Sequence, residues 1–170
     1  EADSVGGVTE TVICGTPAGV GEPWFDSVES VISHAAFSLG GVKGIEFGAG
    51  FAVADMKGSE CNDPLRVSGG RIVTTTNNNG GINGGITNGM PIVFRCAVKP
   101  TPSIAQQQDT VDFIKNENTQ LSIHGRHDPA IIRRICPVLD SVAALCVADM
   151  LSLRYGTDAV SYTHLRAHET

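Results

Sequence analysis

Residues 26–47, DSVESVISHAAFSLGGVKGIEF, decide the fold class of this chain. Apolar residues recur in the first half at helical spacing, which predicts a helix with one buried stripe. The stripe comprises Val28, Ile32, Ala35 and Leu39. Asp26 is expected to open this helix, with Glu29 as its capping-box partner, and Gly40-Gly41 to end it. Residues 42–47 follow directly and have the composition of a strand.

The flanking sequence extends this pattern into a chain that mixes helices and strands. Residues 5–14 alternate in the manner of a strand, so residues 5–47 predict a strand–helix–strand unit. Residues 90–98 are rich in Val, Ile and Phe and predict another strand. A wide apolar face over residues 130–155 predicts a long helix, which Pro137 should kink one turn upstream. The fold class is therefore α/β, of mixed α+β character.

Two polar and weakly periodic segments interrupt these elements. Residues 55–79 are expected to form a mobile segment. Residues 105–118 have two interpretations of equal weight, a hinged cover over a site or a plain surface excursion.

Composition limits the functional classes. A length of 170 residues suits one domain, and 41% hydrophobic with 18% charged residues is typical of a globular protein. A net charge of −6 argues against a nucleic-acid partner, which requires clustered Lys and Arg. No uninterrupted apolar run approaches the ~18 residues of a membrane span, so no membrane partner is predicted.

The cysteines and histidines indicate a reduced protein without a metal site. The five cysteines are odd in number, widely spaced and free of any C-x-x-C pair, which favours a reducing, cytoplasmic location. His124 and His127 lie close together, but no third ligand of suitable type is near them in the sequence. His34 falls in the first predicted helix and is interpreted as a structural or exposed residue.

The sequence Gly125-Arg126-His127-Asp128-Pro129 carries the clearest functional signal. Pro129 suits the first position of the last helix, and Asp128 suits its N-cap. Arg126 would then lie beside the positive end of the helix dipole, where anions bind. This pattern predicts a site for a phosphorylated substrate, and the alternative is a capped helix with a surface arginine. His127 is expected to turn toward the interior or its neighbours, without a catalytic role.

Two further stretches lie upstream, the glycine-rich GGINGGITNG at residues 80–89 and Lys99-Pro100-Thr101-Pro102-Ser103. Glycines let backbone approach a flat ligand, and one cation with two hydroxyls suits a phosphate tail or a polar ring edge. The chain has neither a Walker loop nor a G-x-G-x-x-G fingerprint before a helix. Taken alone, the glycine cluster also fits a bend in a sheet or a mobile loop.

Together and in this order, these segments resemble the chorismate synthase family. The matching segments are residues 3–8, 17–23, 25–26, 38–48, 80–89, 99–104 and 125–129. The resemblance covers residues 3–155 and corresponds to the C-terminal half of such enzymes, which implies part of a β-α-β sandwich fold. Residues 1–160 are accordingly assigned to the C-terminal portion of one domain. Residues 161–170, SYTHLRAHET, look like translated adapter sequence and are interpreted as a non-native tail.

The resemblance implies a lyase that converts 5-enolpyruvylshikimate 3-phosphate to chorismate and phosphate by 1,4-trans elimination, the last step of the shikimate pathway. Such enzymes require reduced FMN, some reduce it with NADPH, and full-length members are expected to be cytoplasmic homotetramers. Arg126 would lie between the flavin and the substrate phosphate, and Asp128 would take part in proton transfer at flavin N5. By position, the flavin-contacting residues are Gly40, Gly41, Gly84, Lys99, Pro100, Thr101, Pro102, Ser103 and Arg126.

This chain departs from the family in two respects. Relatives often carry Asn-Ala where this chain has Gly40-Gly41, which removes any side-chain contact there. The family's N-terminal half, with its general-acid histidines and several substrate-binding arginines, is not among these residues. The alternative function is therefore an inactive fragment that binds flavin or phosphate, and an interaction or structural α/β domain is a third interpretation.

Overall fold

A three-stranded antiparallel sheet lies at the centre of the computed structural model, which describes residues 3–156. Strand β7 (Ile92–Val98) pairs on one side with β1 (Gly7–Ile13) and on the other with β2 (Val42–Phe47). Both outer strands are antiparallel to β7, so β1 and β2 run in the same direction and need a crossover connection. Helix α1 (Val28–Phe37) provides it, which confirms the predicted strand–helix–strand unit.

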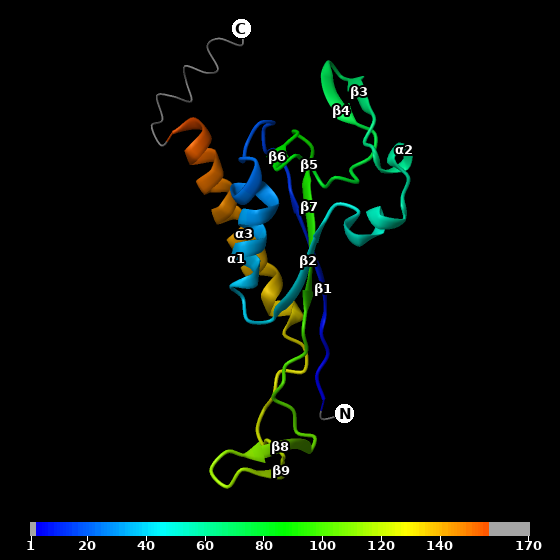
Figure 1. Cartoon of the computed structure of the whole chain (residues 1–170). Coiled ribbons are helices and arrows are strands. Elements are labelled where there is room, and N and C mark those ends of the chain that lie inside the picture. The colour runs from blue at the N-terminus through cyan, green and yellow to red at the C-terminus, as the bar shows by residue number, and fades with distance from the viewer. Residues whose placement is uncertain (1–2, 157–170) are drawn as a thin grey trace.

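Helices α1 and α3 (Ile132–Tyr155) cover the same face of this sheet (Figure 1). Burial alternates along β7, so every second side chain of this strand points into the core. The Phe47 and Phe94 rings contact each other there, with centroids 5.7 Å apart. The buried core consists of Val20, Val28, Ile32, Ala36, Val42, Ile82, Ile92, Phe94, Cys96, Leu139, Ala143, Cys146, Val147 and Met150.

Helix α1 begins later than the sequence predicts. Its N-cap is Ser27, whose Oγ accepts a hydrogen bond from the Ser30 N–H at 3.1 Å. Asp26 instead ends a short 3-10 turn, η1 (Trp24–Asp26), so the prediction that it opens the helix with Glu29 as its capping-box partner was wrong. The left-handed backbone of Trp24 (φ 68°) shapes this turn and leaves Ser27 beside the free N–H groups of the first helical turn.

The buried stripe of α1 consists of Val28, Ile32 and Ala36. Residues four apart share a helix face, so Ala36 rather than Ala35 follows Ile32 in this stripe. Ala35 and Leu39 are only partly buried against the core.

The turn after α1 contains Gly40-Gly41, the predicted end of the helix. The last helical residue is Phe37 and the C-cap is Ser38, so the helix stops before the glycines. His34, interpreted from the sequence as structural or exposed, is exposed.

Helix α3 begins at Ile132, later than predicted, and its N-cap position has no side-chain cap. The prediction that Asp128 caps this helix and Pro129 begins it was therefore wrong. Asp128 Oδ1 accepts from the Ala130 N–H at 3.2 Å and closes a turn ahead of the helix. The Pro129 carbonyl accepts from the Val5 N–H at 2.9 Å, so it is directed toward the N-terminal segment rather than along the helix axis.

Among residues 3–156, α3 is the one helix that is long and apolar enough, by length and composition, to cross a membrane. Asp140 and Asp149 lie within it, which is why no uninterrupted apolar run of that length occurs in the sequence. The helix continues through Pro137, and the kink expected one turn upstream of this residue stays a prediction. Its buried face packs into the core through Leu139, Ala143, Cys146, Val147 and Met150. A core helix of this kind can have the same length and apolar composition as a helix that crosses a membrane.

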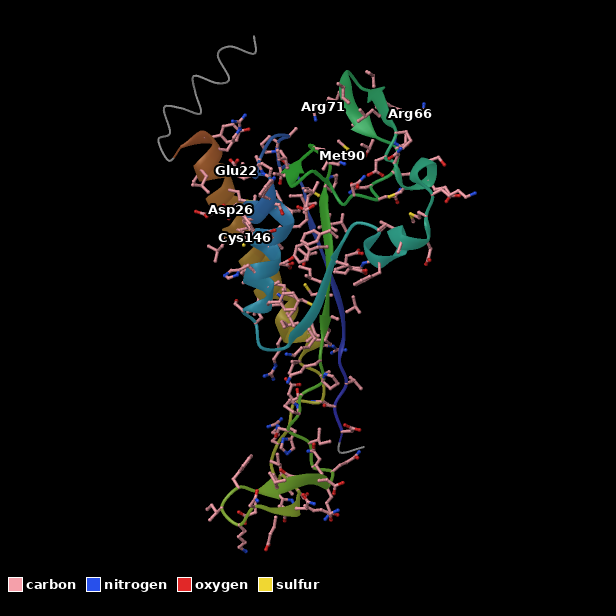
Figure 2. All side chains as sticks on the ribbon, viewed as in Figure 1. Glu22, Asp26, Arg66, Arg71, Met90 and Cys146 are labelled. Atoms are coloured by element: carbon pink, nitrogen blue, oxygen red, sulfur yellow. The ribbon has the colours of Figure 1, made fainter. Side chains whose placement is uncertain are left out.

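Short elements fill the connection between β2 and β7. They are η2 (Gly50–Asp55), α2 (Gly58–Cys61), β3 (Leu65–Ser68), β4 (Arg71–Thr74), β5 (Ile82–Asn83) and β6 (Ile86–Thr87). Strands β3 and β4 form a hairpin that projects from the body and carries Arg66 and Arg71 (Figure 2). The predicted polar segment 55–79 thus contains regular structure that its weak periodicity does not indicate.

A second hairpin, formed by β8 (Gln108–Asp112) and β9 (Glu117–Leu121), lies beyond the end of the central sheet (Figure 1). It connects the Lys99–Ser103 stretch to the Arg126 stretch, so both interpretations of residues 105–118, the hinged cover and the surface excursion, stay predictions. The predicted non-native tail, residues 161–170, lies outside the residues that the structure describes.

Candidate functional site

Gly41 and Lys99, from two of the predicted flavin-contacting stretches, meet at the end of β7. The Lys99 N–H donates to the Gly41 carbonyl at 2.9 Å, which joins the loop after β7 to the loop before β2. A Cβ at Gly41 would lie 3.2 Å from Ile131 Cδ1 and 3.5 Å from Val98 Cγ1. Any side chain here therefore requires Ile131 to move, and glycine lets the chain ahead of α3 pack closely.

The segment before β1 connects the Lys99 loop to the segment before α3. The Ser4 hydroxyl donates to the Thr101 carbonyl at 2.6 Å, and the Val5 N–H donates to the Pro129 carbonyl at 2.9 Å. Three of the predicted stretches therefore gather around one end of the sheet, although they are far apart in the sequence.

His127 joins the same stretches through its imidazole ring. Nδ1 lies 2.9 Å from Ser103 Oγ, and Nε2 lies 2.9 Å from the Ile123 carbonyl oxygen. The residue is half-buried, and the expectation that it turns toward its neighbours is confirmed. These contacts hold Ser103 close to Arg126 and Asp128, the residues on either side of His127.

Lys99 and Arg126 supply the positive charge of this region. Both side chains are exposed, and neither forms an ion pair with another residue in the range 3–156. Their charges remain available to an anion in a chain whose net charge is −6.

Asp128 lies beside Arg134 rather than Arg126. Arg134 Nε is 3.1 Å from Asp128 Oδ2, but the pair lacks hydrogen-bond geometry. Asp128 Oδ2 is buried without a hydrogen-bond partner among the described residues, and so is Thr101 Oγ1. The Arg134 charge compensates Asp128 Oδ2, whereas Thr101 Oγ1 is left unpaired, which costs about 1–3 kcal/mol. Thr101 belongs to a predicted site stretch, and a polar ligand bound there would supply its missing partner.

Gly84, also predicted to contact flavin, lies at the other end of β7. It occupies the β5–β6 turn with φ 61°, exposed and surrounded by open space. Val93 donates its N–H to the Gly80 carbonyl at 3.2 Å, which fixes the segment leading into β5 at the beginning of β7. The seven residues of β7 span roughly 20 Å at ~3.3 Å each. The structure does not bring Gly84 to Lys99 within this chain.

Asp63, which no sequence motif singles out, organises the turn that precedes Gly80. Its Oδ1 accepts from the Asn78 N–H and the Thr76 hydroxyl, both at 2.7 Å. Its Oδ2 accepts from the backbone N–H and the side-chain amide of Asn79, both at 2.9 Å. Partial burial raises the pKa of Asp63, but the hydrogen bonds outweigh it and place the pKa below its ordinary value. An aspartate in an Asn-rich loop was the only signal in the sequence.

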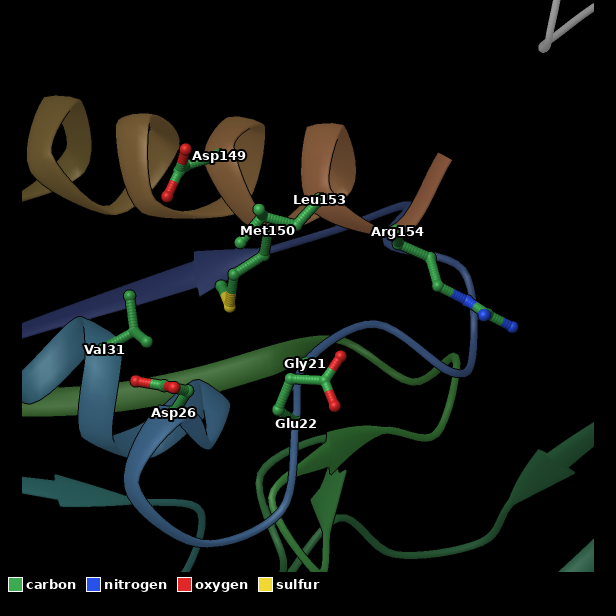
Figure 3. Close-up of a pocket in the computed structure, with 8 residues that line it drawn as sticks. All are labelled: Gly21, Glu22, Asp26, Val31, Asp149, Met150, Leu153 and Arg154. Atoms are coloured by element: carbon green, nitrogen blue, oxygen red, sulfur yellow. The ribbon is translucent and has the colours of Figure 1, made fainter. Parts of the chain in front are cut away.

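A cavity of about 270 Å³ lies at the opposite end of α3 from Arg126 (Figure 3). It combines three carboxylates with an apolar floor between α1 and the last turns of α3. Its lining consists of Gly21, Glu22, Asp26, Val31, Asp149, Met150, Leu153 and Arg154. No predicted site residue lines this cavity, so it is separate from the region around Lys99.

The described residues contain no cluster of three or more His, Cys, Asp or Glu side chains that could hold a metal ion. All five cysteines are free. Burial raises the pKa of Cys96 to about 11 and also raises the pKa of Cys146, which keeps both as thiols at neutral pH.

The region around Lys99 therefore offers two cations, a carboxylate, and the hydroxyls of Thr101 and Ser103. A guanidinium matches the geometry of a phosphate, and a carboxylate can accept a proton. At Gly40 an added Cβ would meet nothing within 4 Å, so the backbone there is open to a ligand. Such a set fits a ligand that combines a phosphate with a flat polar ring.

Comparison with known proteins gives a consistent result. A family model described as chorismate synthase matches residues 1–152. The chorismate synthase of Methanosarcina acetivorans is 52% identical over 156 residues, which cover 92% of this chain and 42% of that protein. The chorismate synthase of Chitinophaga pinensis is 52% identical over 158 residues, which cover 93% of this chain and 47% of that protein. A crystal structure of chorismate synthase matches with a TM-score of 0.73 at 31% identity, and the match covers 92% of this chain and 40% of that one. The chain spans less than half the length of these relatives.

Proposed function

The chain belongs to the chorismate synthase family, and from this premise we propose that it is the C-terminal part of an enzyme that makes chorismate. The proposed reaction is the 1,4-trans elimination of phosphate from 5-enolpyruvylshikimate 3-phosphate with reduced FMN. The observation that carries this proposal is the gathering of the Gly41, Lys99–Ser103 and Arg126–Asp128 stretches around one end of the sheet.

FMN would be held by the Lys99–Ser103 loop and by the backbone at Gly40-Gly41. The unpaired Thr101 Oγ1 and the exposed Lys99 ammonium support this assignment, because both suit a phosphate tail. Bound reduced FMN would supply the electron-rich ring that the elimination requires. Gly84 keeps its flavin assignment solely on the family resemblance.

Arg126 would bind the phosphate of the substrate, both before and during its departure. Its planar guanidinium stays charged at any working pH and can donate two parallel hydrogen bonds to phosphate oxygens. Asp128 would take part in proton transfer at flavin N5, because its carboxylate lies next to Arg126 in the chain and can accept a proton. The Arg134 guanidinium, 3.1 Å from Asp128 Oδ2, would hold the carboxylate in place.

An inactive fragment that binds flavin or phosphate is the second candidate. The specific observation in its favour is length, because the chain spans less than half of each relative that it matches. By resemblance, the general-acid histidines and several substrate-binding arginines belong to the part not represented here. Loss of such groups costs orders of magnitude in rate.

Two measurements separate these candidates. The first is a flavin fluorescence titration of the chain with FMN. The second is anaerobic chorismate formation with reduced FMN, by the chain alone and by a full-length protein that carries these residues. FMN binding, together with chorismate formation by the full-length protein alone, supports the proposal that the chain is part of a working enzyme. Binding without turnover in either form supports the inactive fragment, and absence of FMN binding in both contradicts the proposal.

The remaining expectations concern the full-length protein. We propose that it is a cytoplasmic homotetramer, as its family resemblance implies. Light scattering on the purified full-length protein measures the mass that decides this.

A further inference from the structure

The hydrogen bonds that link Ser103, His127 and Ile123 have a fixed direction. The Ile123 carbonyl oxygen carries no proton, so Nε2 of His127 must be the donor across the 2.9 Å contact. In a neutral imidazole the other nitrogen, Nδ1, then has a lone pair and no proton. The 2.9 Å contact at Nδ1 is therefore a hydrogen bond that the Ser103 hydroxyl donates.

This direction determines what Ser103 offers to a ligand. A serine hydroxyl has one proton and two acceptor positions, and His127 takes the proton. Toward any further group, Ser103 Oγ can therefore only accept a hydrogen bond. Thr101 in the same loop differs, because its Oγ1 has no partner among the described residues and keeps its proton.

We propose that His127 is a positioning residue that makes Ser103 a hydrogen-bond acceptor for an N–H or O–H group of the flavin. The imide N–H of the ring and the ribityl hydroxyls are such groups. A phosphate dianion offers only acceptor oxygens, so the Ser103 hydroxyl has no proton to donate to it, whereas the Thr101 hydroxyl has one. The inference rests on the proposed function, because it takes FMN as the ligand. The sequence alone led us to expect that the hydroxyls of Thr101 and Ser103 each suit a phosphate tail or a polar ring edge. The proposal instead assigns a different part of the ligand to each hydroxyl.

The direction of these bonds can be measured without a ligand. At pH 8, where an ordinary imidazole is neutral, ¹⁵N chemical shifts of the His127 ring in the whole chain identify the tautomer. We expect the proton on Nε2. A proton on Nδ1, or on both nitrogens, overturns the proposal whether or not FMN binds.

The ligand assignment is tested with FMN and with riboflavin, which lacks the phosphate. Ser103→Ala should weaken both affinities by the same factor, about 3- to 10-fold, as expected for one lost hydrogen bond. Thr101→Ala should weaken FMN and leave riboflavin unchanged. Ser141→Ala is the matched control, because that hydroxyl lies on α3 and donates to the Pro137 carbonyl at 2.7 Å. A Ser103→Ala effect confined to FMN overturns the proposal.

Two substitutions of His127 separate positioning from general structural support. Asparagine places its amide near the position of Nδ1, where its oxygen can accept from Ser103, whereas glutamine reaches the position of Nε2 near Ile123. His127→Asn should keep flavin affinity within about twofold, and His127→Gln should match the loss of Ser103→Ala. The reverse order overturns the proposal. If neither the unmodified chain nor the full-length protein binds FMN or riboflavin, the proposed function and the ligand assignment fail, while the tautomer still decides the direction of the bonds.

Discussion

The Lys99 N–H and the Gly41 carbonyl are 2.9 Å apart, one step beyond the Val42–Val98 pair that ends the β2–β7 ladder. The two loops are therefore a continuation of the sheet, and their relative position depends on strand pairing rather than on side chains. The close approach of Ile131 to Gly41 adds the segment before α3 to the same unit.

The first prediction concerns the packing at Gly41. Gly41→Val should lower the free energy of unfolding by about 1–3 kcal/mol, because the new Cβ lies 3.2 Å from Ile131 Cδ1 and the branched side chain overfills the contact. Gly40→Val is the matched control, since a Cβ there meets nothing within 4 Å. Urea unfolding of both variants measures the difference. Equal stability of the two would show that Ile131 moves at no cost.

Arg126→Ala in the full-length protein should weaken substrate binding and slow turnover together. The charge would act on the phosphate in the ground state and as it leaves, which corresponds to roughly 2–4 kcal/mol in transition-state terms. Steady-state kinetics with 5-enolpyruvylshikimate 3-phosphate give both constants. Arg133→Ala, an exposed arginine at the start of α3, is the control and should change neither. Identical kinetics for the two variants would remove Arg126 from the site.

Asp128→Asn should reduce turnover while flavin and substrate affinities change only modestly. The amide keeps an oxygen that can accept from the Ala130 N–H, so the turn before α3 survives. The acceptor of a proton is lost. Turnover, both affinities and the melting temperature are measured on one preparation. Intact turnover, or a protein that unfolds, would show that Asp128 serves only the turn.

Asp63→Ala should destabilise the chain by about 1–3 kcal/mol at pH 7, because the N–H groups of Asn78 and Asn79 lose a charged acceptor. The folded-state pKa of Asp63 lies below its unfolded value, so its contribution is complete above the unfolded value, about 3.9. The contribution is lost as the pH falls through the folded-state pKa. Denaturant unfolding of both proteins across this acid range should show the stability difference shrinking.

The control for Asp63 is Asp55→Ala, an exposed aspartate whose side chain has no hydrogen bond among the described residues. It should leave stability nearly unchanged at every pH. A difference for Asp63→Ala that grows toward low pH would contradict the assignment of the ionised form to the folded state.

The cysteines should differ in reactivity toward iodoacetamide at pH 8. Cys14 and Cys136 are exposed and should be alkylated in the native chain. Cys96 is fully buried and has a pKa of about 11, so it should react only after unfolding. Peptide mass spectrometry before and after addition of urea measures each site. Native labelling of Cys96 at the rate of Cys136 would show that the core opens readily.

Local sequence rules correctly predicted the elements whose own residues show a regular apolar pattern. The predicted strand 42–47 matches β2, and the apolar spacing in residues 26–39 correctly indicates α1. The start of α3 was mispredicted because the Pro129 carbonyl bonds to Val5, a residue that no helix-capping rule considers.

The candidate site was likewise predictable only in part. Its residues came from a family resemblance, but their grouping depends on the strand order β1-β7-β2, which brings the Lys99 loop beside Gly41. Asp63 and the partners of His127 were not predictable, because their hydrogen bonds join residues that lie in different loops.

Hydrogen bonds between Asp63 and Asn79 hold the two ends of the β3–β4 hairpin together, so the hairpin can be changed without moving the rest of the fold. The chain leaves and re-enters the body at neighbouring points, held there by the Asp63 carboxylate and by the Thr75 N–H on the Pro64 carbonyl at 2.9 Å. Each doubling of a loop costs only about 0.6 kcal/mol in closure entropy. The segment between these points can therefore change in length at little cost to the rest of the fold. A reporter peptide spliced in at Gly69-Gly70 should leave the Gly80 turn where it is.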